Sequence, residues 1–253
     1  MTQSPEIIDD LVVLGRAAPE VIEKDGRHTV CLGGWSESKG YVRLYPTHKF
    51  SNANRWNVIK APIVSDDSHD SREESYKIQG SKDDWEHLHE KIEKVGELDR
   101  EEQMELAKDL PKTCRNTLND NRESLGLVEP EEIEDVYLEP VDDPEPVYTD
   151  LDGNRLKGKK SYPHKLYIEY TCKGCEAKTG HRQHCIEWGI YKFWDKNPEY
   201  DPDEVIDALR LRDDDYKKYF FIGNLNNRRN AYIIISIFRW KKDELFQSTI
   251  GNF

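Results

Sequence analysis

The sequence predicts an α+β protein made of two halves, a small β-barrel followed by a mixed α+β domain. Three observations predict this class. Short runs of β-branched and aromatic residues, separated by glycines, open the chain. Helical and strand-like patterns alternate in the second half. Three of the five cysteines and two of the eight histidines fall within residues 172–185, which is a dense local set of side chains that bind metals.

The N-terminal half contains three strand candidates. Residues 28–35 and 40–45 predict a β-hairpin around a turn that ends at Gly40. Pro46 is expected to end the second strand, because proline cannot donate to a ladder. Residues 56–64 predict a third strand. Strands this short, with glycines between them, favour a barrel of the OB or SH3 kind.

Residues 82–108 predict a pair of surface helices with a break near Gly96. Apolar residues recur there at spacings of three and four, and the opposite face is charged. We expect residues 1–128 to form the barrel-like domain, with these helices as an insertion.

An acidic, proline-rich segment follows. Residues 129–152 carry eleven acidic side chains, no basic ones, and four prolines, which exclude a helix. Residues 129–155 are therefore predicted to be a linker between the two halves.

The second half predicts a strand at 165–171, a loop, and a helix over 186–194. A further helix should start at Asp201, where an Asp cap precedes Pro202. Strands are expected at 219–222 and at 231–240, and the latter is apolar enough to be a central strand. Residues 156–253 are the predicted C-terminal domain.

The loop in this domain resembles a zinc-binding motif. Cys172 and Cys175 form a Cys-x-x-Cys pair, and His181 follows after a short loop. His184 and Cys185 compete for the fourth position, which a distant residue could also supply. We expect one Zn²⁺ in a structural rather than catalytic role, so the fold class is α+β with a zinc-containing C-terminal half.

Several short segments, spread in order over nearly the whole chain, resemble an uncharacterised prokaryotic family. They match its motifs VCxAGI, WIRLYP, DxRxESY, SLGxVxP, GHxQxxIDW and FFVGN, at residues 30–34, 41–46, 70–76, 124–130, 180–188 and 220–224. The chain departs from these motifs at Tyr41, at Glu187 and in the spacing from cysteine to His181. The resemblance implies an accessory factor of a mobile-element or defence system.

The charge pattern favours a local nucleic-acid footprint. The net charge is −13, yet residues 155–192 carry nine basic and three acidic side chains. Phosphate groups and bases would be bound by basic and aromatic side chains, and our candidates are Arg43, Tyr45, Lys157, Lys159, Lys160, Lys173, Lys178, Arg182, Arg228 and Arg229.

Two alternatives stay open. A metal-dependent hydrolase or nuclease would use His181 and Glu187, with Asp70, Arg72 and Glu73 as a second polar cluster. A protein-interaction adaptor would use the acidic segment to bind a basic protein partner.

Composition bounds the location of the protein. No run approaches the roughly 18 apolar residues of a membrane helix, and no secretion signal opens the chain. We therefore expect a cytoplasmic protein with reduced thiols and no membrane partner.

Overall fold

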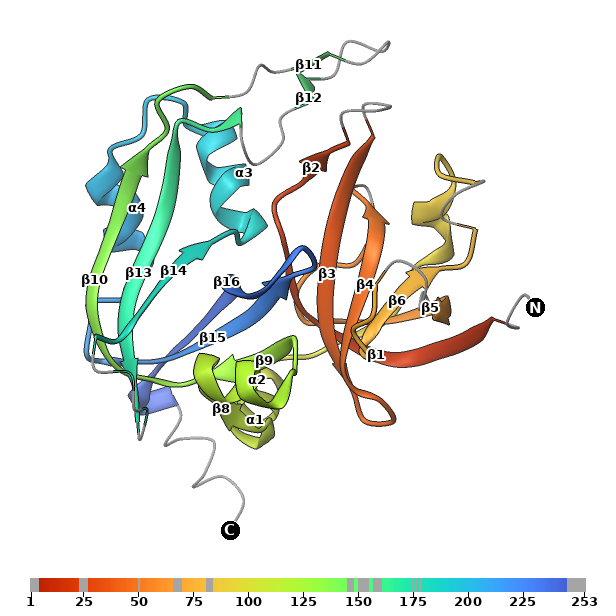
Figure 1. Cartoon of the computed structure of the whole chain (residues 1–253), viewed down its shortest axis with the longest axis horizontal. Coiled ribbons are helices and arrows are strands. Elements are labelled where there is room, and N and C mark those ends of the chain that lie inside the picture. Colours follow the sequence, from red (N-terminus) through yellow and green to blue (C-terminus); the bar gives the residue numbers. More distant parts are fainter. Residues whose placement is uncertain are drawn as a thin grey trace. The chain divides into compact units, whose positions relative to one another are not determined.

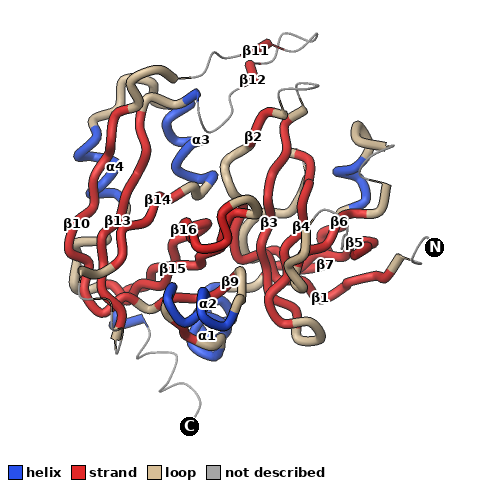
Figure 2. Tube along the Cα trace, in the orientation of Figure 1, coloured by secondary structure: helices blue, strands red, loops and turns tan. Residues whose placement is uncertain are grey.

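The computed structural model is a mixed α+β protein built mostly of strands (Figures 1 and 2). It describes residues 5–22, 27–49, 51–65, 70–80, 84–144, 148–149, 155–156, 161–173, 175, 177 and 179–244. The chain divides into two compact units. Unit 1 comprises Met1–Glu97, Val141–Pro163 and Glu187–Tyr191, and unit 2 comprises Leu98–Pro140, His164–Ile186 and Lys192–Phe253.

Unit 1 contains a closed five-stranded β-barrel. Its strands are β1 (Glu6–Arg16), β3 (His28–Ser36), β4 (Gly40–His48), β5 (Asn57–Ser65) and β6 (Ser75–Ile78). They pair in the order β1-β3-β4-β6-β5, and a β1–β5 pairing closes the ring. The β4–β6 pair is parallel and the other pairs are antiparallel. Register shifts in β1 at Ile8/Leu11 and at Val13/Gly15 bend this strand, which pairs with both β3 and β5.

Alternate residues of these strands fill the barrel. Leu11, Leu32, Leu44 and Ile59 are fully buried in one core cluster, as expected of the inward face of a strand. Three shorter elements accompany the barrel: β2 (Glu20–Val21) pairs with β3, the 3-10 helix η1 is Leu88–Lys91, and β7 (Glu93–Glu97) pairs with β5. A two-stranded sheet pairs β11 (Tyr148–Thr149) with β12 (Arg155–Leu156).

Unit 2 is built on a seven-stranded sheet in the order β10-β13-β14-β16-β15-β9-β8. Figure 1 shows β10, β13 and β14 side by side. The strands are β8 (Lys112–Thr113), β9 (Leu125–Val128), β10 (Pro130–Pro140), β13 (His164–Cys172), β14 (His181–Cys185), β15 (Tyr216–Leu225) and β16 (Arg228–Lys241). The helices of unit 2 are α1 (Arg100–Asp109), α2 (Arg115–Asn121) and α4 (Pro202–Ala208), and α3 (Trp188–Lys196) begins in unit 1 and continues into unit 2 at Lys192.

The predicted central strand is confirmed. β16 lies between β14 and β15, and residues 234–238 are all buried. A strand with both faces covered reads as a continuous apolar run. The predicted start of α4 is also confirmed, because the carboxylate of Asp201 accepts a hydrogen bond from the backbone N–H of Asp203.

Four element predictions are wrong. Residues 88–91 and 93–97 form η1 and β7 rather than the first surface helix. Residues 130–140 form β10 rather than linker, paired with β13 along its length. Residues 181–185 form β14 rather than a loop. Strand β4 continues through a cis Tyr45–Pro46 peptide to His48, because Thr47 and His48 pair with Val30 and Thr29 beyond a register shift.

Within the described residues, no helix combines the length and apolar character needed to cross a membrane.

Candidate metal centre and barrel surface

Four metal-binding side chains converge in unit 2 from three places in the sequence. Cys172 is the last residue of β13, Cys175 lies in the loop that follows, and His181 opens β14. The fourth is Cys114, the N-cap residue of α2. The β13–β14 pairing sets His181 opposite Tyr170, so the hairpin itself brings His181 back toward Cys172.

The distances within this group suit a single ion. The Sγ atom of Cys114 lies 3.1 Å from Sγ of Cys175 and 3.3 Å from Nε2 of His181. Sγ of Cys175 lies 3.2 Å from the same nitrogen. The ligand atoms of Cys114, Cys172 and His181 all lie within 4.8 Å of one another. Three thiolates and one imidazole could therefore hold a metal ion in a tetrahedral site.

Backbone amides support negative charge on two of the sulfurs. The N–H of Asn116 donates to Sγ of Cys114 over 3.4 Å. The N–H of Ala177 donates to Sγ of Cys175 over 3.4 Å. Such outer contacts orient metal ligands and stabilise their ionised form.

Burial shapes the protonation of the two interior ligands. Cys172 is 5% exposed and His181 is 3% exposed. Burial, with the neighbouring Cys114 thiol, raises the pKa of Cys172 well above its usual value. Burial, with the charge of Arg115, lowers the pKa of His181. The lowered pKa favours the neutral form of His181, which is the ligating form of histidine, whereas a bound cation would have to displace the proton of Cys172.

The backbone directly before His181 requires a glycine at position 180. Its φ is +65°, and a Cβ there would lie 2.9 Å from the carbonyl oxygen of Tyr170. Only glycine takes this conformation and this closeness without strain.

The three cysteines also border an open cavity of about 960 Å³, lined by residues that include Lys112, Asn116, Glu131, Lys173 and Lys217.

The structure brings Cys172, Cys175 and His181 together and places the other two predicted ligands elsewhere. His184 lies on the opposite face of β14, where its ring packs on Tyr167 at 5.4 Å. Cys185 is buried opposite Leu166, four residues or about 13 Å along the strand from His181. Cys114 lies at the fourth position, for which His184, Cys185 or a distant residue were the predicted candidates. Sequence reasoning missed it because it lies 61 residues before Cys175.

The outer face of β3 and β4 carries a row of partly exposed aromatic rings: Trp35, Tyr41 and Tyr45. Trp35 and Tyr41 are paired across the strands, with ring centroids 5.0 Å apart. The hydroxyl of Tyr45 lies 3.2 Å from that of Thr29.

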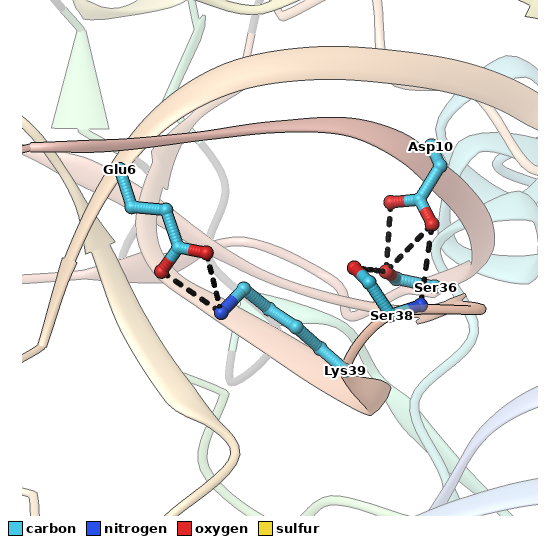
Figure 3. Close-up of polar contacts among 5 residues, drawn as sticks. All are labelled: Glu6, Asp10, Ser36, Ser38 and Lys39. Carbon is cyan, nitrogen blue, oxygen red and sulfur yellow. Dashed lines mark hydrogen bonds and ion pairs between the residues drawn. The ribbon is translucent and has the colours of Figure 1, made fainter.

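The hairpin turn next to this row is held by two acidic residues of β1 (Figure 3). The Asp10 carboxylate accepts a hydrogen bond from the hydroxyl of Ser36 at 2.7 Å. It also accepts one from the backbone N–H of Glu37 at 3.0 Å. Lys39 pairs with Glu6 at 2.8 Å. These bonds fix the turn that joins β3 to β4.

Arg43 does not lie open on this face as we predicted. It is 2% exposed, its backbone N–H donates to the carbonyl of Glu74, and its guanidinium lies 3.5 Å from the hydroxyl of Ser75. The segment that leads into β6 covers it, so Arg43 cannot contact a phosphate without moving that segment.

The predicted catalytic cluster is an internal ion pair in the structure. Arg72 is 8% exposed, and its Nε donates to both oxygens of Asp70, at 2.8 and 3.0 Å. Burial raises the pKa of Asp70, but the hydrogen bonds and charge of Arg72 outweigh it and leave that pKa below its usual value. Glu73 is exposed beside this pair. Glu187 accepts a hydrogen bond from Arg55 at 2.7 Å, so its carboxylate is engaged by a cation.

The predicted basic residues divide into three groups. Lys157, Lys159, Lys160 and Lys178 lie outside the described residues. Arg182 stacks on Tyr167 at 3.8 Å and pairs with Glu139 at 3.1 Å. Lys173, Arg228 and Arg229 are exposed in unit 2.

Comparison with known proteins gives a family match over part of the chain and a structural likeness. Residues 8–110 match the model of a family described as Domain of unknown function (DUF8758). No curated protein matches the chain. Among solved structures, a chain of a replication protein A heterotrimer bound to ssDNA matches with a TM-score of 0.33 and 12% identity. That alignment covers 98% of this chain and 51% of the other, so this chain spans about half the length of the one it matches.

Proposed function

We propose that this chain is a zinc-stabilised protein that binds single-stranded nucleic acid on the outer face of β3 and β4. One observation carries the proposal: the barrel has the strand order β1-β3-β4-β6-β5 with a parallel β4–β6 pair. This is the order of the OB type of Greek-key barrel, whose second and third strands bind oligonucleotides. Those two strands are β3 and β4 here.

The side chains on that face suit single strands. Trp35 and Tyr41 offer a pair of neighbouring rings, Tyr45 lies on the same face beyond the covered Arg43, and stacking of a base on a ring does not depend on sequence. Duplex bases are already stacked and would not reach them. Arg43 is too deeply buried to contact a phosphate, whereas Tyr45 stays a candidate. An accessory role in a mobile-element or defence system stays a prediction.

Zinc is the ion that the metal site favours. Three thiolates and one imidazole are a soft, tetrahedral set that zinc takes in structural sites, and four protein ligands leave no open position for water. The site would hold α2 against the β13–β14 hairpin. The hydrolase alternative loses support, because Glu187 and Asp70 are each bound to an arginine. The adaptor alternative also loses support, because part of the acidic segment that would bind a partner forms strand β10.

The first test replaces one ring of the row. Tyr41→Ala should weaken binding of a labelled oligothymidine or oligouridine about five- to a hundredfold, because stacking contributes about 1–3 kcal/mol per base. Tyr41→Phe keeps the ring and should bind like the parent. Fluorescence anisotropy over a salt series measures both.

Phe193→Ala is the matched control, since Phe193 is an exposed aromatic residue of unit 2, at 41%. Equal effects of Tyr41→Ala and Phe193→Ala would contradict the proposal, as would failure of the parent protein to bind at low salt. Cleavage of the oligonucleotide that requires Glu187 and stops with a chelator would favour the hydrolase instead.

A further inference from the structure

Two segments of unit 2 that are distant in sequence form one polar rim beside the metal centre. The first is residues 115–124, which contain α2, and the second is residues 224–232, around the turn between β15 and β16. The backbone N–H of Asn224 donates to the carbonyl of Ser124 at 2.9 Å. The guanidinium of Arg115 donates to the carbonyl of Asn230 at 3.4 Å. We call residues 115–124 and 224–232 the arginine rim.

The composition of this rim differs from that of the rest of the chain. It holds four arginines against two acidic residues in a chain of net charge −13. It also holds seven of the thirteen asparagines, and all of these except Asn224 are exposed. Guanidinium and amide groups therefore gather on a surface that carries little opposing charge.

Three of the four rim arginines lie at the surface. Arg122, Arg228 and Arg229 are exposed. Among the described residues, neither Arg122 nor Arg228 forms an ion pair. Arg182 is different, since it is paired with Glu139 and stacked on Tyr167.

We propose that the arginine rim is a second contact surface for nucleic acid, which binds the phosphate backbone through Arg122, Arg228 and Arg229. The inference rests on the proposed function, but it uses a surface of unit 2 rather than the barrel. Arginine and asparagine are both common donors to phosphate oxygens. Each asparagine amide also presents an acceptor beside its donor. This pair matches the edge of a base, whereas a carboxylate only accepts hydrogen bonds and cannot use the acceptor. The rim therefore fits nucleic acid better than an acidic protein.

The metal centre would hold this surface in place. Cys114 is the N-cap of α2, and Arg115 is the next residue, whose side chain reaches the second segment. Loss of the metal would release α2 and with it the alignment of the two segments.

The test compares two triple variants of the zinc-loaded full chain. Arg122→Gln/Arg228→Gln/Arg229→Gln removes the rim charges. Lys196→Gln/Lys241→Gln/Lys242→Gln removes three exposed charges elsewhere in unit 2. The rim triple should lower affinity for the oligonucleotide about tenfold at 0.1 M salt. It should also reduce the slope of log affinity against log salt by about 2, at roughly 0.7 per phosphate contact. The control should leave both near the parent values.

The outcomes separate the two proposals. If the rim triple behaves like the control while Tyr41→Ala still weakens binding, the rim inference is wrong and the barrel proposal stands. If the rim triple binds the oligonucleotide normally but no longer binds polyglutamate, the rim docks acidic protein and the inference is overturned. If the parent protein binds no oligonucleotide, both proposals are wrong.

Discussion

At the scale of single residues, the metal centre divides into a part that the sequence reveals and a part that it hides. Cys172, Cys175 and His181 lie within ten residues, and a turn between two strands is enough to bring them together. Cys114 is remote in sequence, and only the packing of α2 beside the hairpin brings it to the group. His184 and Cys185 looked equivalent in sequence, but the alternation of side chains along β14 and its rise per residue place both away from the other candidate ligands.

Substitutions of Cys114 and Cys185 test the ligand set seen in the structure against the set predicted from the sequence. Cys114→Ser should lose zinc and lower the free energy of unfolding by more than about 4 kcal/mol, as loss of a structural metal does. Cys185→Ala should keep one zinc per chain, although it leaves a small cavity in the core. Elemental analysis and thermal unfolding measure the two effects. The reverse result, with zinc retained by Cys114→Ser and lost by Cys185→Ala, would show that the ligand set is wrong.

At the scale of elements, helix-capping residues predicted secondary structure correctly, whereas the spacing of apolar residues alone did not. The start of α4 was predictable because the Asp201 carboxylate caps the helix through the backbone of Asp203, only two residues away. Residues 85–98 have apolar spacing that suits a helix, yet Glu93–Glu97 pairs with β5 instead. Pairing with a neighbouring strand overrides such local preference. The acidic residues of β10 have a structural reason as well, because charges on an edge strand prevent pairing with other chains.

Helix α2 is the element on which the metal centre and the arginine rim both depend. A Cβ at Gly126 in β9 would lie 2.8 Å from Cγ2 of Thr113 and 2.9 Å from Leu118 of α2. Gly126→Ala should therefore push α2 outward, cost about 1–3 kcal/mol of stability, and weaken zinc binding. Zinc affinity is measured by competition with a chromogenic chelator.

Gly96→Ala is the control for this substitution. Its Cβ would meet only Val58, at an ordinary 3.5 Å, so it should be neutral or stabilise by up to about 1 kcal/mol. Zinc affinity that is the same in Gly126→Ala as in the parent would mean that α2 does not position Cys114.

At the scale of the whole molecule, the chain builds two cores rather than two consecutive halves. The barrel of unit 1 could be predicted from its short strands and glycines, although the parallel β4–β6 pair that defines its order could not. Unit 2 draws on three separate stretches of sequence, and its sheet pairs β10 with β13 across the segment between Pro140 and His164 and pairs β9 with β15, which starts at Tyr216. Dividing the sequence at an acidic linker could not predict this arrangement, because strands that are distant in sequence pair with one another in unit 2.

Because each unit has its own core, removal of the metal should act on one unit far more than on the other. We expect a chelator to speed amide hydrogen exchange in α2, β13 and β14, because the four proposed ligands lie at the ends of these elements or in the loop between β13 and β14, while β1, β3 and β5 keep their protection. β16 should stay among the slowest regions, because it is central and covered on both faces. Exchange followed by mass spectrometry, with and without zinc, measures this directly. Equal acceleration in the barrel strands would show that the two units unfold as one cooperative body, and unchanged exchange in β13 and β14 would show that the ion does not stabilise the hairpin.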